Sequence, residues 1–466
     1  MCNVAAYQRC AGCQKVFYCG REHQLEHWPR HKALCKGSYV VESHSNELGR
    51  YLAAGRDIRP GELLLEERPL LTCPPPSTPA LCLACYKELR ADGYIDCPQC
   101  GWPLCSQQCA ANPRDHVLEC VLTSENRTEK MRIRDFGMEH PSYQAIGALR
   151  CLGLEKAAPR KWKALTQLES HSEARAGSKR EQQERFAVAQ FARRALPGLA
   201  DKHSEDDILR LCGILHINGH EFPLRESSLV TVYAKSSLLA HSCRANCCKS
   251  FSSEGAVRIR AARPIKAGEP ITICYTDSLW NTRARRLHLN ETKLFWCRCE
   301  RCLDPSECGT DFSALRCERC GEPGVNPKLD ADGSDDWVCR HCEATMPPTA
   351  ALSLLERVGA EVANLDKGDI SACQRFLKRW GGETLQSDGA ITALSPDHQY
   401  LTDVRLALVQ LYGVGGPGPG ALPALKAAEL NHKTVLCRRL VRLTAQLVPG
   451  KFHQFFEMGG ECSANV

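Results

Sequence analysis

The stretch SLLAHSCRANC, residues 237–247, decides the fold of this chain. It opens as an apolar run, which predicts a buried strand, and it then changes abruptly to His241, Ser242 and Cys243. Imidazole and thiol groups at the end of a buried element are typical of a metal site, a cofactor site or a nucleophile. They also occur as ordinary core residues, so the surrounding sequence has to choose among these four interpretations.

The composition describes a large and mildly basic chain. Its 466 residues are enough for about two to four domains. The net charge of +6 is too small to indicate nucleic acid as a direct partner. No window approaches the roughly 18 apolar residues of a membrane span, and the opening MCNVAAYQRC lacks the regions of a signal peptide. We therefore expect a protein of the cytoplasm and nucleus with no membrane partner.

The 30 cysteines are the most informative feature of the composition. A reducing compartment keeps thiols free, so dense cysteines at regular spacing indicate zinc rather than disulfide bonds. A disulfide scaffold would need secretion and a small core, and the sequence shows neither. We therefore expect Zn²⁺ at several sites.

Cysteine-rich modules alternate with strand-like and helical stretches, which predicts an α+β multidomain fold. The cysteine-rich modules lie at 1–36, 82–120 and 297–342, the strand-like runs at 38–72 and 227–280, and the helical patterns at 141–212 and beyond 349. In the first helical region, KREQQERFAVAQFARRAL predicts one charged helix over 179–196. In the second, apolar residues recurring on one face predict helical hairpins, arranged either as a TPR-like array or as a simple bundle. One such face consists of Leu436, Leu440, Leu443 and Leu447.

Module 82–120 has the ligands for two zinc ions. Zinc takes four ligands in tetrahedral geometry, and a CxxC turn presents two thiolates to one ion. The order of the pairs resembles the MYND zinc finger, in which distant pairs share an ion. The resemblance implies that one ion is bound by Cys82, Cys85, Cys105 and Cys109, and the other by Cys97, Cys100, His116 and Cys120.

Module 1–36 resembles a second MYND finger. The resemblance implies one complete site, formed by Cys10, Cys13, His31 and Cys35. The other site has at most three ligands, Cys2, Cys19 and His23. Here His23 stands where a cysteine is usual. Either the true start of the chain lies upstream of Met1, or this site binds zinc weakly.

The third module opens with FWCRCERC, which contributes only Cys297, Cys299 and Cys302. A structural zinc site is closed by four ligands. We therefore predict that Cys243 folds in from the strand-rich region as the fourth. Further along, Cys317, Cys320, Cys339 and Cys342 have the spacing of a zinc ribbon.

Taken together, the HSC cluster, the segment GEPITICYTD, the CxCxxC closure and the early finger resemble the SET and MYND domain family, in particular its arthropod-type branch. The resemblance covers nearly the whole chain. It implies a SET β-fold with a pseudoknot, a post-SET zinc module and S-adenosylmethionine-dependent methylation of protein lysines. The implied domains are 1–36 MYND-type finger, 38–81 first part of the SET domain, 82–120 inserted MYND-type finger, 121–212 helical insertion, 213–280 core SET domain, 281–348 post-SET and zinc-ribbon region, and 349–466 C-terminal helical domain.

The same resemblance assigns roles to individual residues. Tyr275 would line the methyl-transfer channel as the catalytic residue, and His241 would lie against the cofactor. Asn246 would support the pseudoknot beside the cofactor. Further cofactor contacts would come from Gly49, Arg50 and Asn218, with a hydrogen-bonded core asparagine as the alternative for Asn218.

The chain departs from the family pattern at several positions around this pocket. Ala240 replaces an asparagine that holds the methionine part of the cofactor, and Tyr51 replaces a glycine. Lys293 replaces a tyrosine ahead of the CxC closure, and Ala245 replaces a proline. A second interpretation is therefore a degenerate SET scaffold whose MYND fingers bind proline-rich peptides.

Overall fold

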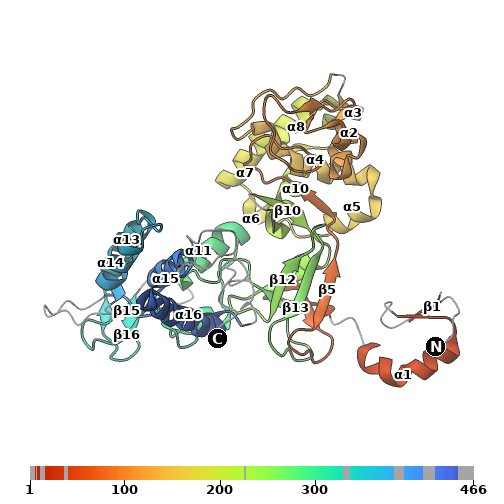
Figure 1. Cartoon of the computed structure of the whole chain (residues 1–466). Helices are drawn as coiled ribbons and strands as arrows, with labels where there is room; N and C mark the ends of the chain where they lie inside the picture. Colours follow the sequence, from red (N-terminus) through yellow and green to blue (C-terminus); the bar gives the residue numbers. More distant parts are fainter. Residues whose placement is uncertain are drawn as a thin grey trace.

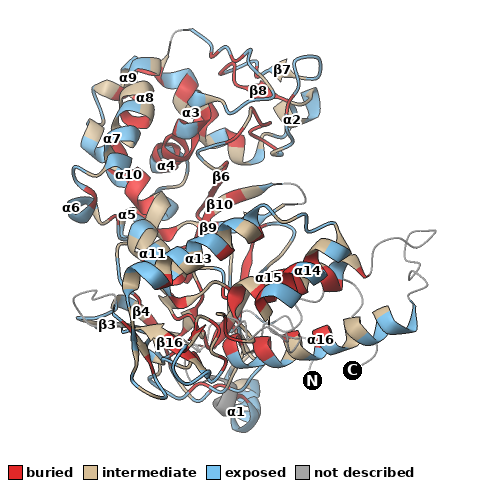
Figure 2. Ribbon diagram, turned by 90° about the vertical axis from the view of Figure 1, so that its left-hand side faces the viewer, coloured by how far each residue is buried: buried red, intermediate tan, exposed pale blue. Residues whose placement is uncertain are grey.

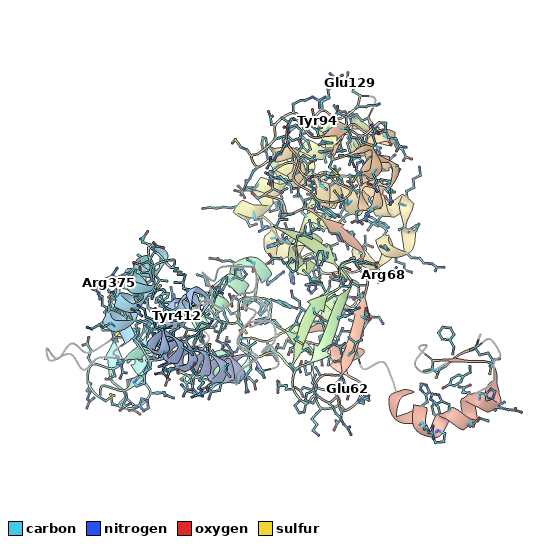
Figure 3. All side chains as sticks on the ribbon, in the orientation of Figure 1. Glu62, Arg68, Tyr94, Glu129, Arg375 and Tyr412 are labelled. Atoms are coloured by element: carbon cyan, nitrogen blue, oxygen red, sulfur yellow. The ribbon has the colours of Figure 1, made fainter. Side chains whose placement is uncertain are left out.

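The computed structural model describes most of the chain and shows helices and small sheets in several regions (Figure 1). The described residues are 6, 8–10, 16–35, 40–127, 129–224, 227–328, 336–381, 393–412 and 426–449. The labelled side chains lie in two separate regions: Tyr94 and Glu129 in one lobe, and Arg375 and Tyr412 in another (Figure 3). The α+β multidomain expectation is confirmed.

Two small antiparallel sheets form the centre of the molecule (Figure 1). The first has the order β12 (Cys247–Phe251), β13 (Val257–Ala261), β5 (Leu63–Glu67), and the second the order β6 (Leu71–Cys73), β10 (Ser228–Val232), β9 (His220–Pro223). In β13, Val257, Ile259 and Ala261 are buried, whereas Arg258 and Arg260 are not. Side chains alternate along a strand, so this pattern gives the sheet one core face.

An antiparallel hairpin precedes the first sheet. It pairs β3 (Val40–Ser45) with β4 (Gly49–Ala54), and Ser45 lies opposite Gly49. Gly49 has φ +62°, a left-handed conformation that favours glycine. Leu52 at the far end of the hairpin is buried in the core of the central sheets.

The expectation of a strand at the start of residues 237–247 is wrong. Ser236–Leu238 forms one 3-10 turn instead, and only Ala240–His241 (β11) is extended. The carboxylate of Glu67 accepts the backbone N–H groups of Lys235 and Ser236, at 2.9 and 2.8 Å. These contacts satisfy donors at the start of the turn. β11 then pairs in parallel with β14 (Thr272–Ile273), which brings two distant segments side by side.

A lobe of helices is inserted between β6 and β9 (Figure 1). Its elements are β7 (Ile95–Asp96), β8 (Pro103–Leu104), α2 (Gln107–Ala111), η1 (Arg114–His116), α3 (Val117–Asn126), η2 (Pro141–Ala145), α4 (Ile146–Ala157), α5 (Pro159–Thr166), α6 (Ser172–Arg175), α7 (Lys179–Glu184), η3 (Arg185–Gln190), α8 (Phe191–Ala195), α9 (Pro197–Ala200) and α10 (Glu205–Asn218). Helix α4 is buried along most of its length (Figure 2). The single helix expected over 179–196 is interrupted by η3, a π-helical turn.

The C-terminal half is mainly helical and contains a small four-stranded sheet. Its elements are α11 (Thr282–Lys293), α12 (Glu300–Leu303), β15 (Leu315–Arg316), β16 (Pro323–Pro327), β17 (Trp337–Cys339), β18 (Thr345–Met346), α13 (Pro348–Ala363), α14 (Ile370–Gly381), α15 (Gln399–Leu411) and α16 (Ala427–Leu447). Buried and exposed residues alternate along α16 (Figure 2). Its predicted leucine face, Leu436, Leu440, Leu443 and Leu447, is buried.

The N-terminal elements form a small unit of their own, with β1 (Gln8–Arg9), β2 (Phe17–Tyr18) and α1 (Arg21–Cys35). Strands β1 and β2 are antiparallel. Within the described parts of the chain, none of the helices is long and apolar enough to cross a membrane.

Candidate functional site

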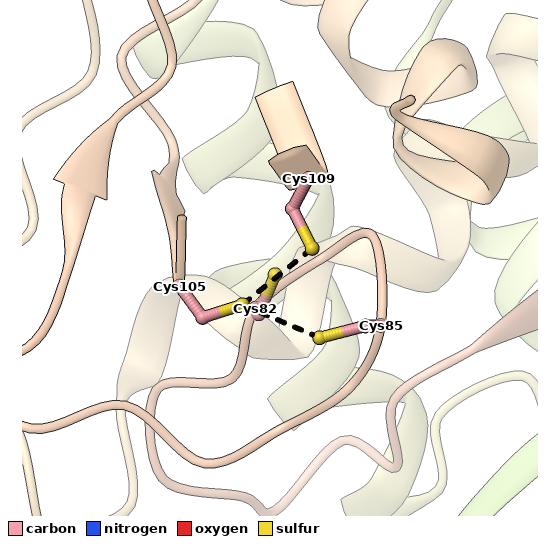
Figure 4. A group of neighbouring side chains, drawn as sticks. All are labelled: Cys82, Cys85, Cys105 and Cys109. Carbon is pink, nitrogen blue, oxygen red and sulfur yellow. Dashed lines mark hydrogen bonds between the residues drawn. The ribbon is translucent and has the colours of Figure 1, made fainter. Parts of the chain in front are cut away.

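The first zinc centre of the inserted finger brings together Cys82, Cys85, Cys105 and Cys109 (Figure 4). The sulfur of Cys105 lies 3.5 Å from that of Cys85 and 3.5 Å from that of Cys109. Zinc–sulfur bonds of about 2.3 Å in a tetrahedron separate the sulfurs by about 3.8 Å. The four thiols therefore fit one zinc ion, as the resemblance to the MYND finger implies.

The second centre of this finger brings together Cys97, Cys100, His116 and Cys120. The sulfurs of Cys97 and Cys120 are 3.8 Å apart, and Nε2 of His116 is 3.5 Å from the Cys100 sulfur. The turn after Cys100 requires glycine: Gly101 has φ +84°, and a Cβ there would meet the Met131 carbonyl oxygen at 2.2 Å. All four ligand residues are buried.

A buried ion-pair network supports the second centre, and the sequence analysis missed it. Nδ1 of His116 lies 3.0 Å from the Glu119 carboxylate, which accepts two hydrogen bonds from Arg150 at 2.8 and 2.9 Å. Burial by itself would raise the pKa of Glu119, but the Arg150 guanidinium and the His116 imidazole together outweigh burial and hold this pKa below its usual value. A carboxylate on the second nitrogen of a zinc-binding histidine fixes the ring orientation. The HxxE spacing of DHVLEC was the available signal.

The post-SET centre brings together Cys243, Cys297, Cys299 and Cys302, as predicted. The Cys243 sulfur is 3.9 Å from that of Cys297 and 3.5 Å from that of Cys302. The set again fits a tetrahedral zinc ion. This centre joins β11 of the central region to the segment after α11.

Two buried arginines and one buried glutamate surround the post-SET centre. The Glu307 carboxylate accepts from Arg285 at 2.7 Å and from Arg301 at 2.7 Å. Arg285 also points at the Cys302 sulfur at 3.8 Å, and Arg301 donates to the Cys243 carbonyl at 3.4 Å. Burial by itself would raise the pKa of Glu307, but the two arginines lower it to about 2. Sequence spacing gave no signal for this network, because its members interact only through the tertiary fold.

The ribbon cysteines also meet. The sulfurs of Cys317 and Cys342 are 3.5 Å apart, and those of Cys320 and Cys339 are 3.7 Å apart. All four ligand atoms lie within 4.8 Å of one another. The arrangement fits a fourth zinc site, the third with four thiolates.

The N-terminal finger is described only in part. Nε2 of His31 lies 3.3 Å from the Cys10 sulfur, and Nδ1 of His23 lies 2.8 Å from the Cys19 sulfur. These are two of the pairings that the sequence predicts. Cys2, Cys13 and the Cys35 side chain lie outside the described residues.

The predicted site residues His241 and Tyr275 lie where β11 passes β14. Nδ1 of His241 accepts the Tyr275 backbone N–H at 3.1 Å, and Nε2 lies 3.3 Å from the Cys243 sulfur. The ring centroids of His241 and Tyr275 are 5.1 Å apart, and the ring centroid of Phe295 lies 5.9 Å from that of His241. Both histidine nitrogens are thus occupied, so His241 can contact a ligand mainly through its ring face and edge.

Tyr275 is held by the neighbouring backbone. Its hydroxyl donates to the Leu239 carbonyl, and burial raises its pKa above the usual value. The phenol is therefore neutral at physiological pH. It can orient an amine through hydrogen bonding but does not supply a negative charge.

Asn246 holds the two segments together. Its side-chain nitrogen donates to the Pro270 carbonyl at 2.8 Å and to Glu269 at 3.2 Å. Its side-chain oxygen accepts from the Thr272 N–H at 2.8 Å and from the Thr272 hydroxyl at 3.0 Å. These contacts give Asn246 the supporting role predicted for it, while its contact with a cofactor stays a prediction.

The other predicted cofactor contacts make bonds within the protein. Asn218 is 7% exposed, and its side-chain nitrogen donates to the carbonyls of Glu169 at 2.7 Å and Ile214 at 2.9 Å. Arg50, beside Gly49, donates to the Gln167 carbonyl. Asn218 therefore has the hydrogen bonds of a core asparagine, and the cofactor roles of these three residues stay predictions.

Lys293 lies beside Tyr275. Its ammonium donates to the carbonyls of His216 at 3.0 Å and Ile217 at 2.8 Å, in the last turn of α10. It also sits 5.9 Å from the centre of the Tyr275 ring. Burial, followed by repulsion from Lys249 and Arg180, lowers the pKa of Lys293 to about 8.

Comparison with known proteins adds the family context. Residues 1–35 match the MYND finger family and residues 49–276 match the SET domain family. The Drosophila melanogaster SET domain-containing protein SmydA-8, isoform A, is 30% identical over 312 residues, which are 66% of this chain and 65% of that protein. The Mus musculus histone-lysine N-methyltransferase SMYD3 is 28% identical over 54% of this chain and 59% of its own length. The Arabidopsis thaliana histone-lysine N-methyltransferase ASHR1 is 26% identical over 64% of this chain and 63% of its own length.

Proposed function

Because the chain belongs to the SET and MYND domain proteins, we propose that it is a zinc-containing protein-lysine N-methyltransferase that uses S-adenosylmethionine. The observation that carries the proposal is the contact of His241 with Tyr275 directly beside the post-SET cysteines. The relatives named as histone-lysine N-methyltransferases support a lysine side chain of a histone or another protein as the substrate. The chain matches less than two thirds of the length of SmydA-8, SMYD3 and ASHR1, so the activity of the whole protein is a proposal.

The residues at this site fit an adenosyl cofactor by their chemistry. Phe295 is 36% exposed beside His241 and offers a ring face on which a planar base can stack. Lys293 offers a cation to an anionic group. When bound, S-adenosylmethionine supplies an electrophilic methyl group.

The residues of the chain then have two tasks. A substrate lysine reacts only as the neutral amine, and an apolar surrounding lowers the lysine pKa because it disfavours the charged form. The Tyr275 ring and the buried core around Ile273 provide such a surrounding. The hydrogen bonds of Tyr275 to His241 and Leu239 fix the position of its ring, which would hold the amine in one orientation.

Calorimetric titration of S-adenosylmethionine into zinc-loaded protein tests the proposal, with Ala240→Asn in parallel. We expect micromolar binding by the wild type. We also expect transfer of labelled methyl groups to a histone mixture, and Tyr275→Phe should reduce this transfer by about 10-fold or more while leaving cofactor binding nearly unchanged. Absence of binding by both the wild type and Ala240→Asn would contradict the proposal.

A second candidate function is favoured by Ala240, which cannot donate a side-chain hydrogen bond. In this alternative, the SET domain is a scaffold and the MYND fingers bind proline-rich peptides. If the wild type shows no binding heat while Ala240→Asn gains it, the scaffold is the better description.

We also propose that the protein works in the cytoplasm and nucleus. Thiolates bind zinc only when they are reduced, and the four-ligand sets use fifteen cysteines and one histidine. Fractionation of cells that express a tagged chain tests this proposal, and recovery from the secreted fraction would contradict it.

A further inference from the structure

The buried cations of this protein differ in how they are compensated. Arg150 pairs with Glu119, and both Arg285 and Arg301 pair with Glu307. Among the described residues, Lys293 has no carboxylate oxygen within the 4.0 Å of an ion pair. Its hydrogen bonds go only to neutral carbonyls.

The surroundings of Lys293 make this uncompensated charge more costly. Lys249 and Arg180 are close enough to lower its pKa. Burial, together with these cations and Lys293 itself, also lowers the pKa values of His216 and His220 to about 3, so both histidines are neutral. The charges that act on Lys293 are therefore cations, although Arg180 itself pairs with Glu184 at 3.0 Å. A cation removed from water without an anion is unfavourable, and an anionic ligand would relieve this cost.

The position of Lys293 indicates which anion. Its ammonium is tied to the last turn of α10, directly before Asn218, and faces the Tyr275 ring. It therefore lies at the same site as His241 and Tyr275. We propose that Lys293 binds the carboxylate of the amino-acid end of the S-adenosyl cofactor and so compensates for the side chain missing at Ala240.

This proposal rests on the proposed function and adds one residue-level contact to it. A hydrogen bond between an ammonium and a carboxylate is about twice as strong as a neutral one, and a buried site strengthens it. The carbonyls of His216 and Ile217 hold two ammonium protons, which leaves the third for a ligand. The lysine is thereby oriented before the ligand arrives.

The test is calorimetric titration of two ligands into zinc-loaded, full-length protein at neutral pH. S-adenosylhomocysteine carries the carboxylate, whereas 5′-methylthioadenosine shares the nucleoside and lacks the whole amino-acid end. In Lys293→Met we expect the affinity for S-adenosylhomocysteine to fall about 10- to 100-fold. The affinity for methylthioadenosine should change less than about threefold, because that ligand has no carboxylate to lose.

Lys249→Met is the matched control. It removes a cation from the same region, but Lys249 lies over the Phe251 ring on β12 and not at Tyr275. We expect it to weaken S-adenosylhomocysteine by less than about threefold, because the general field is reduced, and to leave the uncharged methylthioadenosine nearly unchanged. A loss in Lys249→Met as selective as that in Lys293→Met would overturn the proposal.

A ligand-side measurement covers the case in which Lys293→Met does not fold. The methyl ester of S-adenosylhomocysteine should bind wild-type protein about 10-fold or more weakly than the free acid. Equal binding of acid and ester overturns the carboxylate contact. An unchanged ligand preference in a folded Lys293→Met protein also overturns it, because Lys293 would then serve only as a cap of α10. Tighter binding of S-adenosylhomocysteine by Lys293→Met overturns it as well, because the lysine side chain would then block the ligand site.

Failure of this inference differs from failure of the proposed function. If the wild type binds both ligands and Lys293→Met does not change the preference, only the role of Lys293 is rejected. If the wild type binds neither ligand, the methyltransferase proposal fails and this inference fails with it.

Discussion

The inserted finger and the post-SET centre use similar ligands but are closed in different ways. All eight finger ligands lie within residues 82–120, whereas the post-SET centre takes Cys243 from 54 residues before Cys297. Each centre is backed by a buried carboxylate paired with arginine. In the finger the carboxylate orients the ligand His116, while at the post-SET centre the arginines contact the Cys243 carbonyl and the Cys302 sulfur.

This difference shows what each centre stabilises. The finger folds a local segment, because its ligands are near one another in sequence and closing short loops costs little entropy. The post-SET centre joins the segment that follows β11 to the segment after α11, whereas the short β11–β14 pairing and the side chain of Asn246 join the β11 region to residues 270–273. It therefore has the larger influence on the site formed by His241 and Tyr275.

The strongest test of this comparison is loss of the shared ligand, Cys243→Ser. Structural zinc contributes roughly 10 kcal/mol or more to small metal-dependent folds, so we expect a loss of about 5 kcal/mol or more in the free energy of unfolding of the central region. Zinc content measured by atomic emission should fall by about one ion per chain. The matched control is Cys247→Ser, a buried cysteine outside the four-sulfur sets. Equal zinc loss in both variants would contradict the assignment of Cys243.

The support of the post-SET centre is tested by Glu307→Gln. The substitution leaves Arg285 and Arg301 buried without a counter-charge, which typically costs about 3–5 kcal/mol. Chemical denaturation monitored by fluorescence measures the cost. Glu66→Gln removes an exposed ion pair with Arg258 as the control and should cost less than about 1 kcal/mol. Similar costs for the two variants would show that the buried network is not stabilising.

The support of the finger is tested by Glu119→Gln. Arg150 would lose its charge partner and His116 its carboxylate, so we expect a cost of about 3 kcal/mol. Loss of such a partner also weakens metal binding by about 10- to 100-fold. Chelator competition should show one zinc ion leaving more easily in this variant. Unchanged zinc retention would mean that Glu119 serves only as the partner of Arg150.

The smallest effect concerns Lys293 in the ligand-free protein. Its folded-state pKa of about 8 lies below the ordinary value, so the cost of burying its charge is fully present below pH 8 and disappears as the pH rises toward 10. The stability of the wild type relative to Lys293→Met should therefore rise by about 2 kcal/mol between pH 7 and pH 10. Chemical denaturation at each pH measures this difference. A difference that stays constant with pH would contradict the lowered pKa.

Local spacing predicted those parts of the molecule whose partners are close in sequence. The ribbon follows from its two CxxC pairs, and the order of the pairs in 82–120, through its resemblance to the MYND finger, implied both centres there. The face of α16 follows from the helical period of its leucines. The prediction of a strand before His241 is wrong. Glu67, which is far away in sequence, accepts a backbone hydrogen bond at the start of this segment, which forms a 3-10 turn.

The sequence by itself determined the family resemblance and the types of zinc ligand, because cysteines at fixed spacing in a reducing compartment indicate zinc. It also determined that the three cysteines at 297–302 need a fourth ligand, because a structural zinc site has four. Only the tertiary structure revealed the Glu119 and Glu307 networks and the hydrogen bonds of Asn218 within the protein. It alone also placed Lys293 at Tyr275 with no carboxylate of the described residues at ion-pair distance. These features depend on burial and on contacts between distant segments, because a charge becomes costly or valuable only when the fold removes it from water.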